Sequence, residues 1–94
     1  MKTAPMKRAQ LTAAHDTMDK VYATLAAELA LPAHFARNLD ALWDALLRDV
    51  PGPFEIVWKG APAAARKIGP KAKALLALLG DLQDARGDFK FRRG

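Results

Sequence analysis

The sequence predicts an α/β fold in which a small parallel sheet packs against helices. Residues 54–58 form a short apolar strand pattern, and residues 88–92 alternate apolar and charged side chains as a half-exposed strand does. A weaker strand pattern covers residues 7–12, and helical patterns separate these segments. Strands that alternate with helices along a chain form parallel sheets joined by right-handed crossovers, so we expect that arrangement here.

Length and composition restrict the classes of protein to which the chain can belong. Its 94 residues predict one small domain, residues 1–94, in which residues 1–12 are only weakly patterned. The absence of cysteine excludes disulfides, thiolate metal sites and cysteine nucleophiles. The basic start at residues 1–8 lacks the apolar segment of a secretory signal, and no apolar run is long enough to cross a membrane. We therefore expect a cytoplasmic protein with no membrane association.

Charge is unevenly distributed along the chain. The net charge is +5 at pH 7, yet residues 30–58 have a local balance of −2 and residues 59–94 one of +6. Because local fields steer molecular encounters, the acidic middle can attract a cationic partner. The basic final third could contact nucleic acid, although it has almost no interleaved aromatic side chains on which bases would stack.

The first helix is expected between the weak strand and Pro32. Asp16 or Asp19 can cap its start, and the helix runs to about residue 30. Pro32 ends it because the residue before a proline avoids the helical region. No role is evident for His15. The apolar side chains recur every three or four residues, as one buried helix face requires: Met18, Val21, Tyr22, Leu25 and Leu29.

A second helix is predicted from Asn38, a residue type favoured at the N-cap, to the stop at Pro51-Gly52-Pro53. Asp40, Asp44 and Arg48 form a row along one margin of this helix, at about 100° per residue. Like charges at this spacing repel, so folding alone gives little reason to place Asp40 beside Asp44. The buried face consists of apolar side chains at helical spacing: Leu39, Leu42, Trp43, Leu46, Leu47 and Val50.

Two more helices are expected between the strand at 54–58, which places Trp58 in the core, and the last strand. Residues 63–68 can form a short helix, and Gly69-Pro70 separates it from a longer helix over residues 71–85. Gly87 ends the longer helix. Its core side carries Leu75, Leu78, Leu79 and Leu82.

Two short segments carry a resemblance to a known family: residues 29–32 (LALP) and, after five intervening residues, 38–44 (NLDALWD). On these segments the chain closely resembles the barstar family, bacterial intracellular inhibitors of the ribonuclease barnase. Weaker similarity covers most of the chain, including the strand after Pro53 and the stretch from Asp81 to Phe91. The resemblance implies a three-stranded parallel sheet with helices packed against it, and a cis peptide bond at Gly52-Pro53.

In that family the second helix and the loop before it plug the active site of a microbial ribonuclease, where acidic side chains take the place of RNA phosphates. The resemblance therefore implies a protein partner, a ribonuclease or related toxin with a basic active site, and neither enzyme activity nor a cofactor. By position, it assigns partner-binding roles to His34, Asn38, Asp40, Trp43, Asp44 and Asp81.

The chain departs from the family pattern near the implied interface. His34 replaces a tyrosine, and Ala36 stands where glycine is usual. Arg37 and Arg48 place positive charge at the rim of the interface. Inhibitors of this family are typically acidic, whereas this chain is basic overall.

Each candidate residue also has a purely structural interpretation. Asp40 falls in the first helical turn, where a carboxylate interacts favourably with the helix dipole. Asp44 can pair with Arg48 four residues later. Trp43 points mainly into the core, and a loop histidine such as His34 is often only solvated.

Catalysis, metal binding and nucleic-acid binding are the other classes of function that such a sequence could serve. The chain has no serine or cysteine nucleophile and only two distant histidines, and two acids four residues apart are too few ligands for a hard cation. We therefore predict neither an enzyme nor a metal-binding protein. The alternative function is a nucleic-acid-associated accessory domain that uses the basic residues between 59 and 93.

Overall fold

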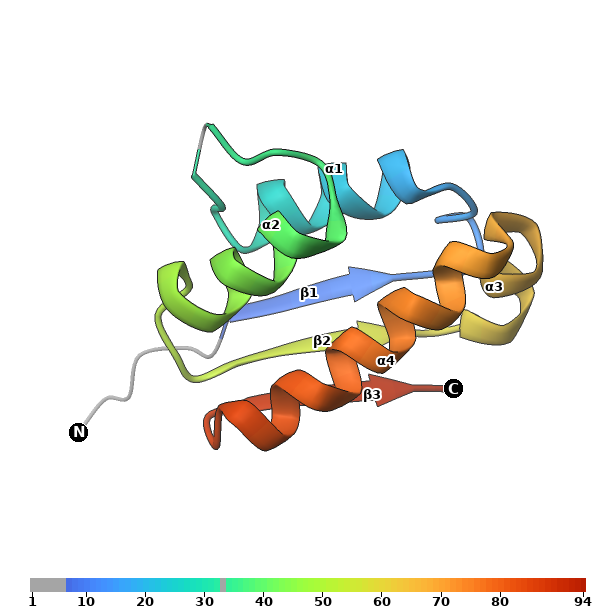
Figure 1. The fold of residues 1–94 in the computed structure, drawn as a ribbon. Coiled ribbons are helices and arrows are strands. Elements are labelled where there is room, and N and C mark those ends of the chain that lie inside the picture. The colour runs from blue at the N-terminus through green and yellow to red at the C-terminus, as the bar shows by residue number, and fades with distance from the viewer. Residues whose placement is uncertain (1–6, 33) are drawn as a thin grey trace.

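The computed structural model describes residues 7–32 and 34–94. Three strands, β1 (Lys7–Leu11), β2 (Phe54–Trp58) and β3 (Phe89–Arg93), form a parallel sheet in the order β1-β2-β3. Figure 1 shows the three arrows running in the same direction, with β2 in the middle. The predicted α/β fold with a three-stranded parallel sheet is confirmed. The first half of the weakly patterned segment, residues 1–6, lies outside the described residues.

Helices fill the two crossovers between the strands. The chain passes from β1 through α1 (Met18–Glu28), α2 (Leu39–Asp44) and the π-helical turn η1 (Ala45–Asp49) to β2. It then returns through α3 (Ala61–Ile68) and α4 (Pro70–Ala85) to β3. In Figure 1, α4 lies along the sheet beside β3 and next to α2. No helix of the described part of the chain is long and apolar enough to cross a membrane.

One face of the sheet is covered by the helices and forms the core. The side chains that alternate onto this face, among them Ile56 and the predicted core residue Trp58, are fully buried in β2. They pack against buried leucines of the helices, for example Leu42 of α2 and Leu79 of α4. Leu78 is only half-buried, so it lies at the margin of the core rather than within it.

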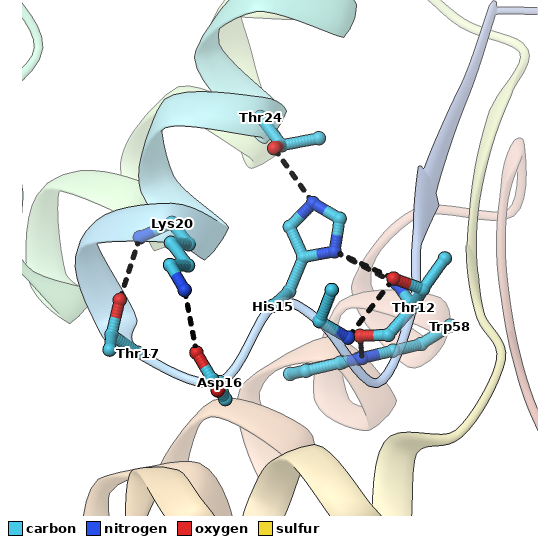
Figure 2. Close-up of polar contacts among 8 residues, drawn as sticks. Thr12, His15, Asp16, Thr17, Lys20, Thr24 and Trp58 are labelled. Carbon is cyan, nitrogen blue, oxygen red and sulfur yellow. Dashed lines mark hydrogen bonds and ion pairs between the residues drawn. The ribbon is translucent and has the colours of Figure 1, made fainter.

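The start of α1 differs from the sequence prediction. Its N-cap is Thr17, whose hydroxyl accepts a hydrogen bond from the backbone N–H of Lys20 at 3.2 Å. Asp16 instead accepts from the Lys20 ammonium at 2.9 Å (Figure 2). Asp19 lies inside the first turn of the helix. Asp16, Thr17 and Asp19 all have side chains that can cap a helix. Because Asp16 pairs with Lys20, Thr17 becomes the N-cap.

His15 has a structural role that the sequence did not indicate. Its Nδ1 accepts from the backbone N–H of Thr12 at 2.9 Å, and its Nε2 lies 2.9 Å from the hydroxyl of Thr24 on α1 (Figure 2). The carbonyl of Thr12 in turn accepts from the indole N–H of Trp58 at 3.0 Å. His15 therefore ties the end of β1 to α1 and indirectly to the buried tryptophan of β2.

Candidate functional site

Asn38 begins the helix that carries the predicted acids. Its backbone is extended, and its side-chain oxygen accepts from the backbone N–H of Ala41 at 2.7 Å, so the predicted N-cap is confirmed. Leu42 is buried beneath the helix, which leaves Asp40 and Asp44 exposed on its outer side. Asn38 therefore orients the acidic row through the backbone while its own side chain is engaged in capping.

The helix does not end as a regular α-helix. Residues 45–49 wind as a π-helical turn, the conformation defined by hydrogen bonds from an N–H to the carbonyl five residues earlier. In that register the donor for the Leu46 carbonyl would be Pro51, and proline has no N–H. Arg86 supplies the missing donor, since its Nη1 lies 3.0 Å from the Leu46 oxygen and 2.6 Å from the Val50 oxygen. The chain then turns into β2 through a cis Gly52-Pro53 bond, as the family resemblance implied.

A groove between α2 and α4 brings together three of the predicted site residues. It has a volume of about 420 Å³ and is lined by Asp40 and Trp43 from one helix and by Asp81 from the other. Leu39 and Leu78 contribute apolar walls. Both carboxylates are exposed, whereas Trp43 is half-buried and packs against the core. The groove thus combines an aromatic surface with two carboxylates at its rim, a combination suited to a cationic side chain.

A second hollow lies on the other side of the same helix. It has a volume of about 190 Å³ and is lined by His34 from the preceding loop and by Asp44 and Asp49 from the helix. Phe35 also lines it, and its ring meets that of Tyr22 edge-on at 5.9 Å, which anchors the loop to α1. His34 and Asp44, predicted as site residues from different elements, therefore border the same hollow.

Arg48 lies beside the acidic row, as the spacing predicted. Its Nε is 3.0 Å from Oδ1 of Asp44, and the two side chains are 71% and 63% exposed. An ion pair this exposed contributes little to stability because solvent screens it. The pairing alone therefore does not account for an acid at position 44.

Two residues near the hollows were not predicted from the sequence. Asp49 is five residues after Asp44, so an ideal α-helix would place it about 140° around the axis from Asp44. The π-helical turn brings positions five apart onto one side, and both carboxylates line the same hollow. Lys71, at the start of α4, lines a further hollow with Asp40, and no helical periodicity within either element could have indicated that neighbour.

The basic residues of the final third are not gathered into one surface. They occur on α3, α4 and β3, and Arg86 is used within the fold by Leu46, Val50 and Asp88. Among residues 7–32 and 34–94, no group of three or more His, Asp or Glu side chains is placed to hold a metal ion. Five of the six predicted site residues, all except Asn38, line the two hollows beside α2.

A comparison with protein families agrees with this architecture. A family model described as Barstar (barnase inhibitor) matches residues 6–92. The matched range contains β1, β2, all of β3 except its last residue, both hollows and every residue predicted to contact a partner.

Proposed function

The chain belongs to the barstar family, and from that premise we propose that it inhibits a cytoplasmic ribonuclease, or a related toxin with a basic active site. In this proposal α2 and the loop before it cover the partner's active site, and carboxylates occupy the positions of RNA phosphates. The observation that supports it most strongly is the placement of Asp40, Asp44 and Asp81 around two adjoining hollows. Inhibition by occlusion needs neither turnover nor a cofactor.

The two hollows suggest a division of roles. The groove that contains Asp40, Trp43 and Asp81 is open enough to admit an arginine or lysine side chain, which would lie against the indole between two carboxylates. The smaller hollow, with Asp44 at its rim, offers a second cation a carboxylate beside the imidazole of His34. Asn38 contributes to partner binding by fixing the start of α2, in addition to any direct contact that it makes with the partner.

Structural interpretations explain part of this arrangement. Asp40 lies in the first turn of α2, so the helix dipole accounts for a carboxylate there. Neither that effect nor the exposed pair with Arg48 accounts for Asp44 and Asp49 in one hollow, or for Asp81 opposite Asp40 in the other. Carboxylates that repel one another in the free protein are expected where a cationic partner compensates them.

The decisive experiment combines capture with inhibition. The wild-type protein, immobilised, should retain a basic ribonuclease from extracts of its native cells, and the purified ribonuclease should lose RNA-cleaving activity at one equivalent of inhibitor. The Asp40→Ala and Asp44→Ala variants should each weaken the complex by about 2–5 kcal/mol, the usual cost of leaving a buried cation unpaired and a range to which the barnase–barstar pair itself contributes. Barnase serves as a defined second target.

Asp19→Ala is the matched control, because it removes an exposed carboxylate from the start of α1. That variant should capture and inhibit as the wild type does. If Asp40→Ala and Asp44→Ala bind a captured ribonuclease as tightly as the wild type, the acidic hollows are ordinary helix surface and the proposed mechanism is wrong.

A further inference from the structure

The sheet has a second face that the helices do not cover. Along β1 and β3, side chains on the helix side are buried or half-buried except for Arg93 at the end of β3, whereas those that alternate onto the other face are exposed. On the central strand β2, the side chains of the second face are buried or half-buried. The strand register sets the residues of this open face in two rows: Arg8, Glu55 and Lys90, then Gln10, Val57 and Arg92. Three cations and one carboxylate therefore share the surface.

Glu55 organises this open face. It is 4% exposed although it lies on the uncovered side, because the side chains of Arg8 and Arg92 close over it from the two neighbouring strands. The Nε of Arg8 bonds to one carboxylate oxygen, and the Nε of Arg92 lies 3.3 Å from the other. A carboxylate at the centre of the sheet thus holds two guanidinium groups on either side of it.

The two arginines retain most of their binding capacity. The contact of each arginine with Glu55 is made by its Nε, and among the described residues the terminal nitrogens donate no hydrogen bond to another group. Their side chains are 55% and 67% exposed, so more than half of each remains open to a ligand. One carboxylate neutralises one of the three cations, and the open face keeps an excess of positive charge. Guanidinium groups held in fixed positions are well suited to bidentate contacts with phosphate oxygens.

The edges of the sheet are poorly suited to pairing with an added peptide strand, so a ligand is expected to lie across the open face instead. The outward N–H of Gln10 on β1 donates to the Glu28 carboxylate at 2.9 Å. On the opposite edge, the N–H of Phe91 donates to the side-chain oxygen of Gln83, also at 2.9 Å. Side chains from α1 and α4 therefore occupy donors that an added strand would need.

We propose that this open face binds the phosphodiester backbone of single-stranded RNA without regard to base sequence, through Arg8, Lys90 and Arg92 held around Glu55. Val57 is the only apolar side chain in its two rows, and no aromatic side chain is available for base stacking. Such a surface can read repeated backbone charge but not bases, so binding is moderate and strongly dependent on salt.

This surface is separate from the acidic hollows. The groove is formed by α2 and α4, and the smaller hollow by α2, η1 and the loop before α2; these helices cover the other side of the sheet. A ligand on the open face is therefore independent of ribonuclease inhibition at the hollows. A protein bound at α2 would leave the open face accessible to RNA.

The test measures the fluorescence anisotropy of a short labelled oligouridylate at increasing salt. The variant Arg8→Gln/Glu55→Gln/Arg92→Gln removes both guanidinium groups without leaving Glu55 as an unpaired buried acid. It should bind about tenfold more weakly at low salt, and its log–log salt dependence should be less steep by about 1.4, because each phosphate contact on a single strand contributes about 0.7. Lys90→Gln, an exposed substitution, should weaken binding about threefold.

Lys73→Gln, on the exposed side of α4, is the matched control, because it changes net charge by the same amount as the triple variant and as Lys90→Gln. It should bind as the wild type does, and thermal melting verifies that each variant is folded. An equal loss in Lys73→Gln would show that only net charge matters and would overturn the proposal. An absence of RNA binding at low salt would also overturn the proposal. This holds even if phosphatidylserine vesicles or polyglutamate bind through Arg8 and Arg92, because the ligand would then not be RNA.

Discussion

Arg86 donates to the carbonyl oxygen of Leu46, and this contact joins the end of α4 to the last turn of the helix that carries Asp40 and Asp44. The same guanidinium donates to Val50 and, through Nε and Nη2, to both carboxylate oxygens of Asp88. It also lies 4.9 Å from the centre of the Phe54 ring. One side chain, only 14% exposed, therefore connects η1, β2 and the start of β3.

Arg86→Ala should destabilise the protein by about 2–4 kcal/mol, because two carbonyls lose a charged donor in a largely buried position. Arg86→Lys should recover less than half of this loss, since one ammonium cannot reproduce the fork that contacts both Leu46 and Asp88. Urea unfolding of the three proteins measures the difference. Equal stability of the lysine variant and the wild type would show that charge alone suffices.

Gly52 is required by close approach to the same cluster. A Cβ at this position would overlap the Asp88 carboxylate and come within 2.9 Å of Nη2 of Arg86. Gly52→Ala should therefore cost about 1 kcal/mol by displacing Asp88 from its bidentate pair. In an Asp88→Ala background the same substitution should be nearly neutral. Additive losses in this double-mutant cycle would place the origin of the cost elsewhere.

The Arg86–Asp88 pair also predicts a dependence of stability on pH. The hydrogen bonds from Arg86 lower the pKa of Asp88 below its ordinary value of 3.8. Because the folded-state pKa is the lower one, the stabilisation is fully present above the unfolded value and is lost as pH falls through the folded value. Asp88→Asn should therefore flatten the fall in unfolding free energy below about pH 4, by a small amount because the carboxylate is exposed. An unchanged acid limb would contradict the assignment.

The sequence predicts an element well where its apolar pattern and the residues that begin or end it indicate the same bounds. The bounds of β2 match the prediction because an apolar run lies between proline and glycine turns, and Asn38 caps α2 because no neighbouring residue competes for that position. At α1, the N-cap is Thr17 rather than Asp16 or Asp19, because the Asp16 carboxylate pairs with the Lys20 ammonium. The sequence alone does not show which of these three residues will cap the helix.

The parts that the sequence does not predict depend on residues far apart in the chain. The apolar spacing of residues 39–50 fits an α-helix, whereas the structure has a π-helical turn whose Leu46 carbonyl accepts from Arg86, forty positions later. That turn in turn places Asp49 beside Asp44. The burial of Glu55 likewise requires one arginine from each flanking strand, and strand alternation alone would have left it exposed.

His15 provides a test of the connection between β1 and α1. His15→Ala should destabilise the protein by about 1–2 kcal/mol, because the Thr12 N–H loses its acceptor and Thr24 loses its partner. In His15→Asn the side-chain oxygen takes the place of Nδ1, so part of the stability should return. Thermal unfolding compares the variants, with Thr24→Val isolating the second contact. Identical losses in the alanine and asparagine variants would show that the Thr12 contact contributes nothing.

Arg48 provides a test of the proposed binding of a ribonuclease at the acidic surface. In the free protein its guanidinium lies on Asp44, and both side chains are largely exposed. Arg48→Ala should therefore change the unfolding free energy by well under 1 kcal/mol. If Asp44 accepts a cation of the ribonuclease, as proposed, removing Arg48 frees that carboxylate and removes a like charge from the approaching partner, so affinity should stay level or rise and association should quicken at low salt. Stopped-flow association and equilibrium titration of wild type and Arg48→Ala against the captured ribonuclease measure both quantities, with Arg37→Ala as a second rim cation for comparison.

A large loss of affinity on removing Arg48 would instead assign it a direct contact with an acidic group of the partner, and the pair with Asp44 would then position Arg48 for that contact.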